Sequence, residues 1–138
     1  MSDSTLVDTG PLVSVFNTRD SHHQWALSFF KNLKPPLYTC DAVITEVLYL
    51  LQGDVRSVDY MFGLMERKTL ISDFSAQSHA LSVKKIMKKY ADTPMDFADA
   101  CLVRMSELRP DAHIWTLDSG FLVYRRNGRA NIPLVYPS

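Results

Sequence analysis

The sequence has no excess of either charge and no long apolar run. Its 138 residues include 15 Lys or Arg and 15 Asp or Glu, so the formal net charge is zero. A protein with this balance has no global field that draws it to nucleic acid or to a membrane surface, and any polyanion must bind to a local patch. No apolar stretch approaches the roughly 20 residues that span a bilayer. We therefore expect no association with a membrane.

Cysteine is scarce as well. Cys40 and Cys101 are the two cysteines and do not form a C-x-x-C pair, so the pattern indicates neither a disulfide framework nor a zinc site. The first residues lack the basic region and apolar stretch of a secretory signal, which predicts a cytoplasmic protein. An apolar share of 46% and a charged share of 22% exclude disordered and fibrous classes. The length predicts a single domain over residues 1–138.

Short apolar runs alternate with longer helical patterns. The predicted strands are 5–7, 37–40, 70–72, 113–116 and 132–135. Helices are expected to begin near Pro11, Asp54 and Pro94, and three others are expected to be capped by Ser21, Asp41 and Ser75. The helix after Asp54 is expected to turn Val58, Phe62 and Met65 inward. This alternation predicts an α/β fold, a three-layer α/β/α sandwich with a central parallel sheet and right-handed connections.

Four acids occupy positions that such a sheet can bring together. Asp8 and Asp118 each follow a predicted strand, and ligands of parallel sheets bind beyond the carboxyl ends of the strands. Glu46 and Asp99 lie in predicted helices among apolar residues. Taken singly, each acid is as easily explained as a turn or capping residue. Their joint placement in four separate segments favours one acidic site.

A cluster of this kind needs a positive counter-charge. Two close carboxylates repel by about 4 kcal/mol at an effective dielectric constant of 20. The four segments contain no Lys or Arg before Arg104, one turn beyond Asp99. A divalent cation is therefore the expected partner, and all-oxygen ligands favour Mg²⁺ or Mn²⁺ over zinc. Asp96 shares a helix face with Asp99 and is either an outer ligand or a helix cap.

Four segments of the chain resemble, in order, the acidic motifs of the PIN-domain ribonucleases. They are LVDTGPLV at 6–13, ITEV at 44–47, PMDFADA at 94–100 and TLDSGF at 116–121. The resemblance extends from Leu6 to about Pro133. The length of the chain makes it most similar to the VapC-type toxins of prokaryotic toxin–antitoxin pairs. Ser119 and Gly120 depart from the larger polar residues that family members often carry there, which leaves substrate contacts at these two positions open.

The resemblance implies a Mg²⁺- or Mn²⁺-dependent endoribonuclease. By this analogy Asp8 and Asp99 are direct metal ligands, and Glu46 and Asp118 complete the pocket directly or through water. Thr9 and Thr116 orient water or carboxylates by hydrogen bonds. Water attacks the phosphodiester, leaving 5′-phosphate and 3′-hydroxyl ends. The resemblance also implies an RNA substrate, a cognate antitoxin and a homodimer.

Three further groups of residues carry weaker hypotheses. Tyr124, Arg125, Arg126 and Arg129 lie close to Asp118 in sequence and suit RNA binding, although a surface loop explains them equally well. Lys84, Lys85, Lys88 and Lys89 form a basic stripe that either contacts phosphates or is solvated. The apolar residues at 61, 62, 64 and 65 line two faces of one predicted helix, whereas contact with the core requires a single apolar stripe. This surplus favours either a partner surface or a methionine-rich core.

Two other functions compete with the nuclease. One is a PIN-like module that binds RNA or protein without cutting, although it leaves the repelling acids without a purpose. The other is a phosphotransfer domain with Asp8 as phosphoacceptor. No second Asp stands two residues after Asp8 and no lysine ends a late strand, so the sequence does not support it.

Overall fold

A computed structural model describes residues 4–137. Residues 1–3 and 138 lie outside the described part, so the ends of the predicted domain 1–138 and the predicted absence of an N-terminal signal are not addressed by it. The helices are α1 (Thr9–Phe16), α2 (His23–Asn32), α3 (Asp41–Leu50), α4 (Val55–Glu66), α5 (Ala80–Lys89), α6 (Phe97–Leu108) and the 3-10 turn η1 (Ser119–Leu122). The strands are β1 (Thr5–Val7), β2 (Leu37–Thr39), β3 (Leu70–Ser72), β4 (His113–Trp115), β5 (Arg125–Arg126), β6 (Ala130–Asn131) and β7 (Leu134–Val135).

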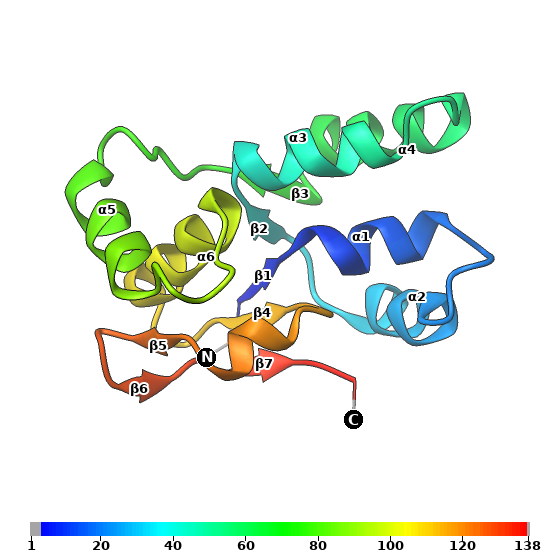
Figure 1. The fold of residues 1–138 in the computed structure, drawn as a ribbon. Coiled ribbons are helices and arrows are strands. Elements are labelled where there is room, and N and C mark those ends of the chain that lie inside the picture. The colour runs from blue at the N-terminus through cyan, green and yellow to red at the C-terminus, as the bar shows by residue number, and fades with distance from the viewer. Residues whose placement is uncertain (1–3, 138) are drawn as a thin grey trace.

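Five strands form one parallel sheet in the order β3-β2-β1-β4-β7. Helices α1 to α4 lie on one side of the sheet, and α5 and α6 lie on the other (Figure 1). This arrangement confirms the predicted three-layer α/β/α sandwich. None of the helices within residues 4–137 is both long and apolar enough to cross a bilayer.

The strand order reverses beside β1. The chain passes from β1 to β2 and β3 in one direction and then returns to β4 on the opposite side of β1. Val7 is paired with Trp115, and the next amide, that of Asp8, still donates to the carbonyl oxygen of Trp115 at 3.0 Å. Ligands of open parallel sheets bind at such a reversal, outside the carboxyl ends of the strands. The fold therefore has its expected binding edge between the ends of β1 and β4.

The core lies on both faces of the two central strands. Leu6, Val7, Ile114 and Trp115 are fully buried, as expected for a parallel sheet covered by helices on each side. The ring of Trp115 packs against Phe29 with centroids 4.8 Å apart. Burial on both faces holds the ends of β1 and β4 rigidly in register.

Three predicted N-caps, those of Ser21, Asp41 and Ser75, are wrong, whereas the helix expected to open at Asp54 is confirmed. The carboxylate of Asp54 accepts from the Ser57 amide and caps α4. Helix α2 begins after His22 without a side-chain cap, so Ser21 does not cap it. Asp41 is the first residue of α3, not its cap, and accepts from the Ser72 hydroxyl at 2.6 Å.

The third wrong cap is Ser75. Its hydroxyl accepts from the Ser78 amide in a separate turn, and α5 begins only at Ala80. Pro11 is likewise displaced from the predicted helix start, because α1 already begins at Thr9. Ser, Thr and Asp stabilise isolated turns by the same hydrogen bond that caps a helix, so sequence does not separate the two uses.

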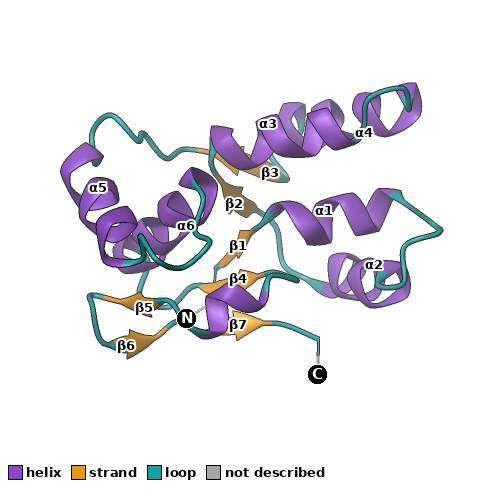
Figure 2. Ribbon diagram, viewed as in Figure 1, coloured by secondary structure: helices purple, strands orange, loops and turns teal. Residues whose placement is uncertain are grey.

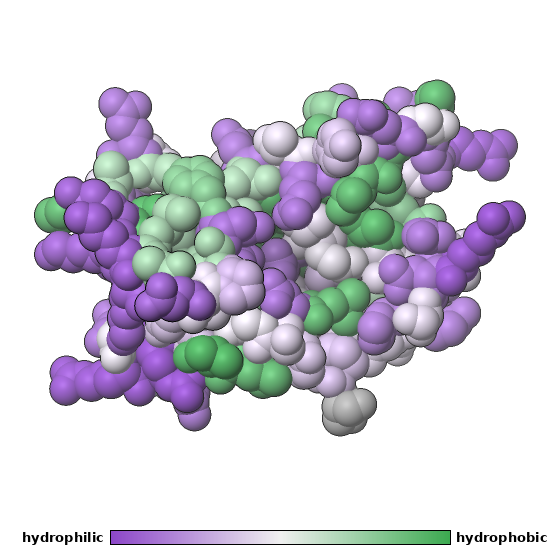
Figure 3. All heavy atoms as spheres, viewed as in Figure 1, coloured by the Kyte–Doolittle hydropathy of each residue, from purple (hydrophilic) through white to green (hydrophobic). Residues whose placement is uncertain are grey.

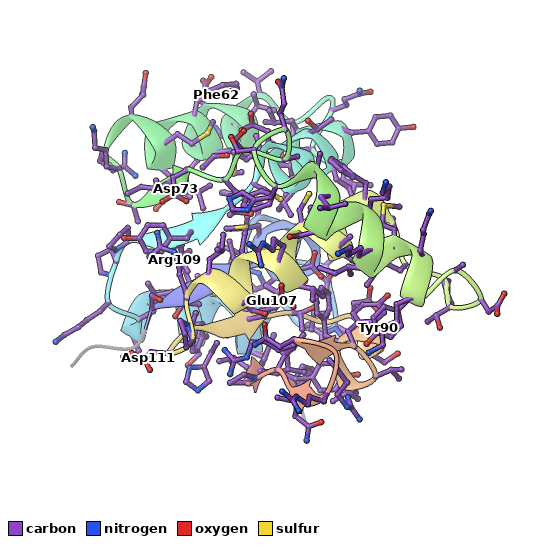
Figure 4. The ribbon with its side chains drawn as sticks, turned by 90° about the vertical axis from the view of Figure 1, so that its left-hand side faces the viewer. Phe62, Asp73, Tyr90, Glu107, Arg109 and Asp111 are labelled. Carbon is purple, nitrogen blue, oxygen red and sulfur yellow. The ribbon has the colours of Figure 1, made fainter. Side chains whose placement is uncertain are left out.

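Helix α4 is rotated relative to the expectation. Met61 and Leu64 are buried, whereas the ring of Phe62 is 47% exposed and lies on the outer side of the helix (Figure 4). The expectation that Phe62 faces the core is therefore wrong, while Val58 and Met65 pack against the core as predicted. Because Met61 and Leu64 are core residues, they do not contribute to a partner surface.

The small β-hairpin formed by β5 and β6 was not predicted from the sequence (Figure 2). Its turn contains Asn127 and Gly128, whose φ angles are 53° and 79°. Asn-Gly is the usual pair for a turn with two left-handed residues. This dipeptide was the available signal for the hairpin.

Candidate functional site

An acidic pocket of about 310 Å³ opens at the reversal between β1 and β4. All four acids predicted from the sequence line it, together with Asp96 and Thr9. Its lining residues are Asp8, Thr9, Gly10, Glu46, Asp96, Asp99, Leu117 and Asp118. Four separate segments of the chain thus meet in one concave surface, as the sequence argument required.

Asp8 is held by two hydrogen bonds at the point where β1 passes into α1. Its Oδ1 accepts from the Thr9 amide and its Oδ2 from the Thr116 hydroxyl, each at 2.8 Å. Extended backbone at Asp8 makes it the N-cap of α1. The side chain is only 7% exposed, so the carboxylate is fixed and largely removed from water.

Asp99 enters the pocket from the first turn of α6. Asp96 caps this helix by accepting from the Asp99 amide at 2.8 Å, and the Asp99 carboxylate accepts in return from the Asp96 amide at 3.4 Å. This reciprocal pair is a capping box. Asp96 is therefore a helix cap that also lines the pocket, and Asp99 is 5% exposed.

Asp118 is exposed and stands at the rim, two residues after Thr116. The Thr116 hydroxyl accepts from the Asp118 amide at 2.9 Å while it donates to Asp8. One buried hydroxyl thus connects the two strand ends. Ligand oxygens of Asp8, Asp99 and Asp118 lie within 4.8 Å of one another, a spacing at which one cation can contact all three.

Glu46 reaches the pocket from the middle of α3. Its Oε1 accepts from the Thr9 hydroxyl at 2.6 Å, which ties α3 to the start of α1. Glu46 is exposed, so its side chain lies at the solvent side of the pocket. Thr9 and Thr116 thus make the hydrogen bonds to carboxylates that the resemblance implied.

No basic side chain neutralises these acids. Among residues 4–137, none of the ion pairs includes a pocket acid. Arg104, the nearest basic residue along α6, instead pairs with Glu107 at 3.1 Å. The pocket therefore carries several carboxylates without a protein counter-charge.

Burial and mutual repulsion raise the pKa of both buried acids. The pKa of Asp8 rises from 3.8 to about 6, mainly because burial disfavours its charge and further because Asp118 and Glu46 are close. The pKa of Asp99 rises from 3.8 to about 8, mainly through burial and then through Asp96, Asp8 and Asp118. The protein alone thus leaves both carboxylates under-compensated near neutral pH.

The pocket fits a hard divalent cation. Its donor atoms are carboxylate oxygens, which Mg²⁺ and Mn²⁺ prefer, and no thiolate or imidazole lines it. Asp99, Asp118 and Glu46 each accept hydrogen bonds from the protein through one carboxylate oxygen. Within the described residues, the other oxygen of each accepts none: Oδ1 of Asp99, Oδ2 of Asp118 and Oε2 of Glu46. A cation would supply the missing positive charge to these oxygens.

A family model for the PIN domain matches residues 5–127. The chain belongs to the PIN domain family. This confirms the resemblance on which the sequence analysis relied. Among solved structures, the crystal structure of Mycobacterium tuberculosis VapC20, described as a sarcin-ricin loop cleaving toxin, is similar in fold. It superposes with a TM-score of 0.74 at 15% identity over 84% of this chain and 91% of the other. The curated proteins include no match to the sequence.

This PIN domain places Tyr124 inside the molecule, where it supports the site. The Tyr124 ring is 1% exposed, and its hydroxyl donates to Oδ2 of Asp99 at 3.2 Å. Tyr124 therefore offers no free ring face for a base, which corrects the prediction that Tyr124 contacts RNA. The Asp99 contact was not predictable from the sequence, because the two residues are 25 positions apart.

The arginines next to Tyr124 bind the backbone of their own PIN domain. Arg125 donates to the carbonyl oxygens of residues 122–124, and Arg126 donates to those of Ser106 and Pro110. Arg129 lies exposed in the hairpin turn. RNA contacts by Arg125, Arg126 and Arg129 stay a prediction.

Gly120 is required by the way this PIN domain packs Tyr124. A Cβ at residue 120 would lie 2.8 Å from the Tyr124 hydroxyl oxygen and 3.1 Å from Oδ1 of Asp118. The Gly120 amide also donates to the same Asp118 oxygen at 2.8 Å. The departure from the family pattern at this position therefore has a steric reason.

Proposed function

We propose that the protein is a divalent-metal-dependent endoribonuclease that hydrolyses RNA phosphodiester bonds, and that it acts in the cytoplasm as the toxin of a type II toxin–antitoxin system. One observation carries the proposal. Ligand oxygens of Asp8, Asp99 and Asp118 converge within 4.8 Å, two of these acids are buried, and no basic side chain within residues 4–137 forms an ion pair with them. Membership of the PIN domain family and the fold shared with the toxin VapC20 give further support.

Mg²⁺ or Mn²⁺ is the proposed cofactor. Asp8, Asp99 and Asp118 would hold it, with Glu46 contributing directly or through water. Such an ion lowers the pKa of water and offsets negative charge on phosphoryl oxygens. Mg²⁺ and Mn²⁺ are proposed together, because the oxygen donors suit both.

The residues around these acids hold them in place for the reaction. Thr116 fixes Asp8 and the backbone of Asp118, and Thr9 fixes Glu46. Such preorganisation means that little reorganisation is needed when charge develops on the phosphoryl group. Thr9 supplies a hydroxyl to the pocket, but that hydroxyl donates to Glu46 and is assigned a positioning role. Water is the proposed nucleophile, and the products carry 5′-phosphate and 3′-hydroxyl ends.

A cognate antitoxin and a second copy of the chain are the proposed protein partners. Large apolar side chains are exposed on α3 and α4, which follow one another along the chain. They are Tyr49, Leu50, Val55, Tyr60 and Phe62. Exposed apolar surface of this kind is typical of protein–protein contacts. This surface replaces the partner surface that the sequence analysis placed at residues 61–65.

The test is RNA cleavage with defined metal and matched variants. We expect cleavage of RNA with Mn²⁺, loss of cleavage with EDTA, and mapped products with 5′-phosphate ends. Asp8→Asn keeps the shape of the side chain but removes its charge, and we expect at least about a 100-fold lower rate. Asp59→Asn alters an exposed acid of α4 outside the pocket and serves as the matched control.

The competing function predicts different results. A non-catalytic PIN-like module would bind RNA or protein yet leave the RNA intact with every metal. EDTA-resistant cleavage that Asp8→Asn does not reduce would also contradict the proposal. For the toxin role, expression without an antitoxin is expected to arrest growth, and normal growth with confirmed folded protein would refute it.

A further inference from the structure

Helix α5 carries positive charge alone. Four of its residues, Lys84, Lys85, Lys88 and Lys89, are exposed lysines, and Ala80–Lys89 contains no acid. None of the four forms an ion pair within the described residues. Lys89 donates to the carbonyl oxygen of Gly128 at 2.7 Å, so it is already engaged by the hairpin. A protein of zero net charge thus concentrates unpaired cations on one helix.

An apolar groove of about 540 Å³ runs along the side of α5 that carries Lys84 and Lys88. Its remaining lining consists of small and apolar side chains and ends at one aromatic ring. These residues are Ala76, Ala80, Val83, Met87, Ala91 and Phe97. The region of α5 and the start of α6 appears in Figure 3 as a pale green patch bordered by hydrophilic side chains. Phe97 is 47% exposed, although it follows directly after Asp96 of the acidic pocket.

The groove and the acidic pocket meet at one peptide bond. Asp96 lines the acidic pocket, and the next residue, Phe97, lines the groove. The two cavities are therefore lined by consecutive residues of the chain, at the start of α6. Phe97 is the first residue of α6, and the capping box of Asp96 and Asp99 fixes its position.

We propose that this groove binds the single-stranded RNA that flanks the cleaved bond, with a base stacked on Phe97 and the neighbouring phosphates contacted by Lys84 and Lys88. The inference rests on the proposed ribonuclease function and specifies its substrate contacts. An uncompensated acidic pocket repels a polyanion, so cations beside it are needed to hold the strand. Grooves that bind single-stranded nucleic acid combine aromatic rings, on which the bases stack, with positively charged side chains, which contact the phosphates.

The charge of the groove argues against a second copy of this chain as the occupant. Two such copies would bring Lys84 and Lys88 of each into contact with the lysines of the other, and like charges repel. A nucleic acid strand supplies the opposite charge at every nucleotide.

Binding is tested without cleavage, by fluorescence anisotropy of a labelled single-stranded RNA in EDTA. Removing a stacking ring weakens binding by about 5- to 150-fold in comparable sites, and we expect Phe97→Ala to fall in this range. Phe97→Trp keeps a ring and is expected to restore binding. Leu108→Ala is the control, because the Leu108 side chain at the end of α6 has a similar exposed fraction of 46% and lines neither the groove nor the acidic pocket.

The lysines are tested by salt dependence. The logarithm of affinity falls as the logarithm of salt concentration rises, and each lost phosphate contact makes this slope about 0.7 less steep for single strands. The double variant Lys84→Ala/Lys88→Ala is therefore expected to make the slope about 1.4 less steep. Lys31→Ala/Lys34→Ala removes two exposed lysines at the end of α2, away from α5 in Figure 1, and is expected to leave the slope unchanged.

The results separate this inference from the proposed function. Failure of wild-type protein to bind the RNA, or binding by Phe97→Ala within twofold of wild type with an unchanged lysine slope, overturns the groove assignment. If such variants bind normally while wild-type protein still cleaves RNA, the nuclease function stands and the inference fails. If wild-type protein binds through Phe97 but never cleaves, the groove stands and the nuclease function fails.

Discussion

The Tyr124 hydroxyl donates a hydrogen bond to Oδ2 of Asp99 across 3.2 Å. The two residues belong to the segment after η1 and to α6, so the contact joins parts of the chain that are distant in sequence. The rings of Tyr90 and Phe121 pack edge-on against Tyr124 and fix its orientation. Burial and the nearby acids raise the pKa of Tyr124, so its hydroxyl keeps its proton and acts as a donor.

Tyr124→Phe tests this contact by removing one oxygen. A hydrogen bond to a charged group contributes about 1.5 to 3 kcal/mol, so the ionised form of Asp99 becomes harder to reach. In the metal-free protein we expect the pKa of Asp99, already raised to about 8, to rise further. Because the metal must displace this proton, the acid limb of the pH–rate profile at subsaturating Mn²⁺ is expected to move to higher pH. Partial rescue of activity at alkaline pH distinguishes this effect from unfolding. An unchanged profile would show that Tyr124 does not act on Asp99.

The raised pKa values of Asp8 and Asp99 predict how stability depends on pH in the metal-free protein. Both acids titrate near 3.8 when unfolded and near 6 and 8 when folded. Between pH 3.8 and the pKa of each folded-state carboxyl, the folded state binds more protons than the unfolded state. The free energy of unfolding therefore falls as pH rises through this range. Each group contributes a slope of up to about 1.4 kcal/mol per pH unit. Urea unfolding in EDTA from pH 4 to pH 9 measures this slope.

Asp99→Asn is the matching variant for the pH experiment. It removes a titrating group while keeping an oxygen that accepts from Tyr124, so we expect a flatter profile and a more stable metal-free protein at pH 8. Acidic groups held close together for function commonly reduce stability. A variant that is less stable than wild type at pH 8, with an equally steep profile, would contradict the assigned pKa shift.

Two glycines offer a matched pair of substitutions. Gly120→Ala places a Cβ 2.8 Å from the Tyr124 hydroxyl oxygen, so either Tyr124 or Asp118 must move. We expect about a 10-fold or greater loss of cleavage activity, in line with the cost of displaced catalytic groups. Gly63→Ala in α4 meets only the flexible end of Arg67 and should raise stability by up to about 1 kcal/mol. Equal activity of the two variants would contradict the role of Gly120.

The acids were predictable because their positions follow directly from topology. Asp8 and Asp118 come after strands that pair side by side, and parallel strands deliver the residues after them to one edge. Asp99 and Glu46 were selected by their apolar neighbours in predicted helices. The resemblance then supported them, since a helix in sequence does not reveal which strand it covers. The hydroxyl contacts of Thr9 and Thr116 were implied by the same resemblance and agree with the structure.

Tyr124, Phe62 and Phe97 could not be placed from the sequence. Each aromatic residue fits equally well in a core or on a surface, and the packing of distant elements decides between the two. Tyr124 is enclosed by Tyr90 and Phe121, whereas α4 is rotated so that Phe62 faces outward (Figure 4). The lysines of α5 were readable as a stripe, but their proximity to the acidic pocket depends on how α5 packs against α6.

Titration of the metal-free protein with Mn²⁺, followed by the electron paramagnetic resonance signal of free Mn²⁺, tests the central claim most directly. The account predicts saturable binding at pH 8 that Asp8→Asn and Asp99→Asn abolish and that Asp59→Asn preserves. It also predicts weaker binding at pH 6, where protons compete for Asp99. Absence of saturable binding to wild-type protein, or equal binding to Asp99→Asn, would contradict it.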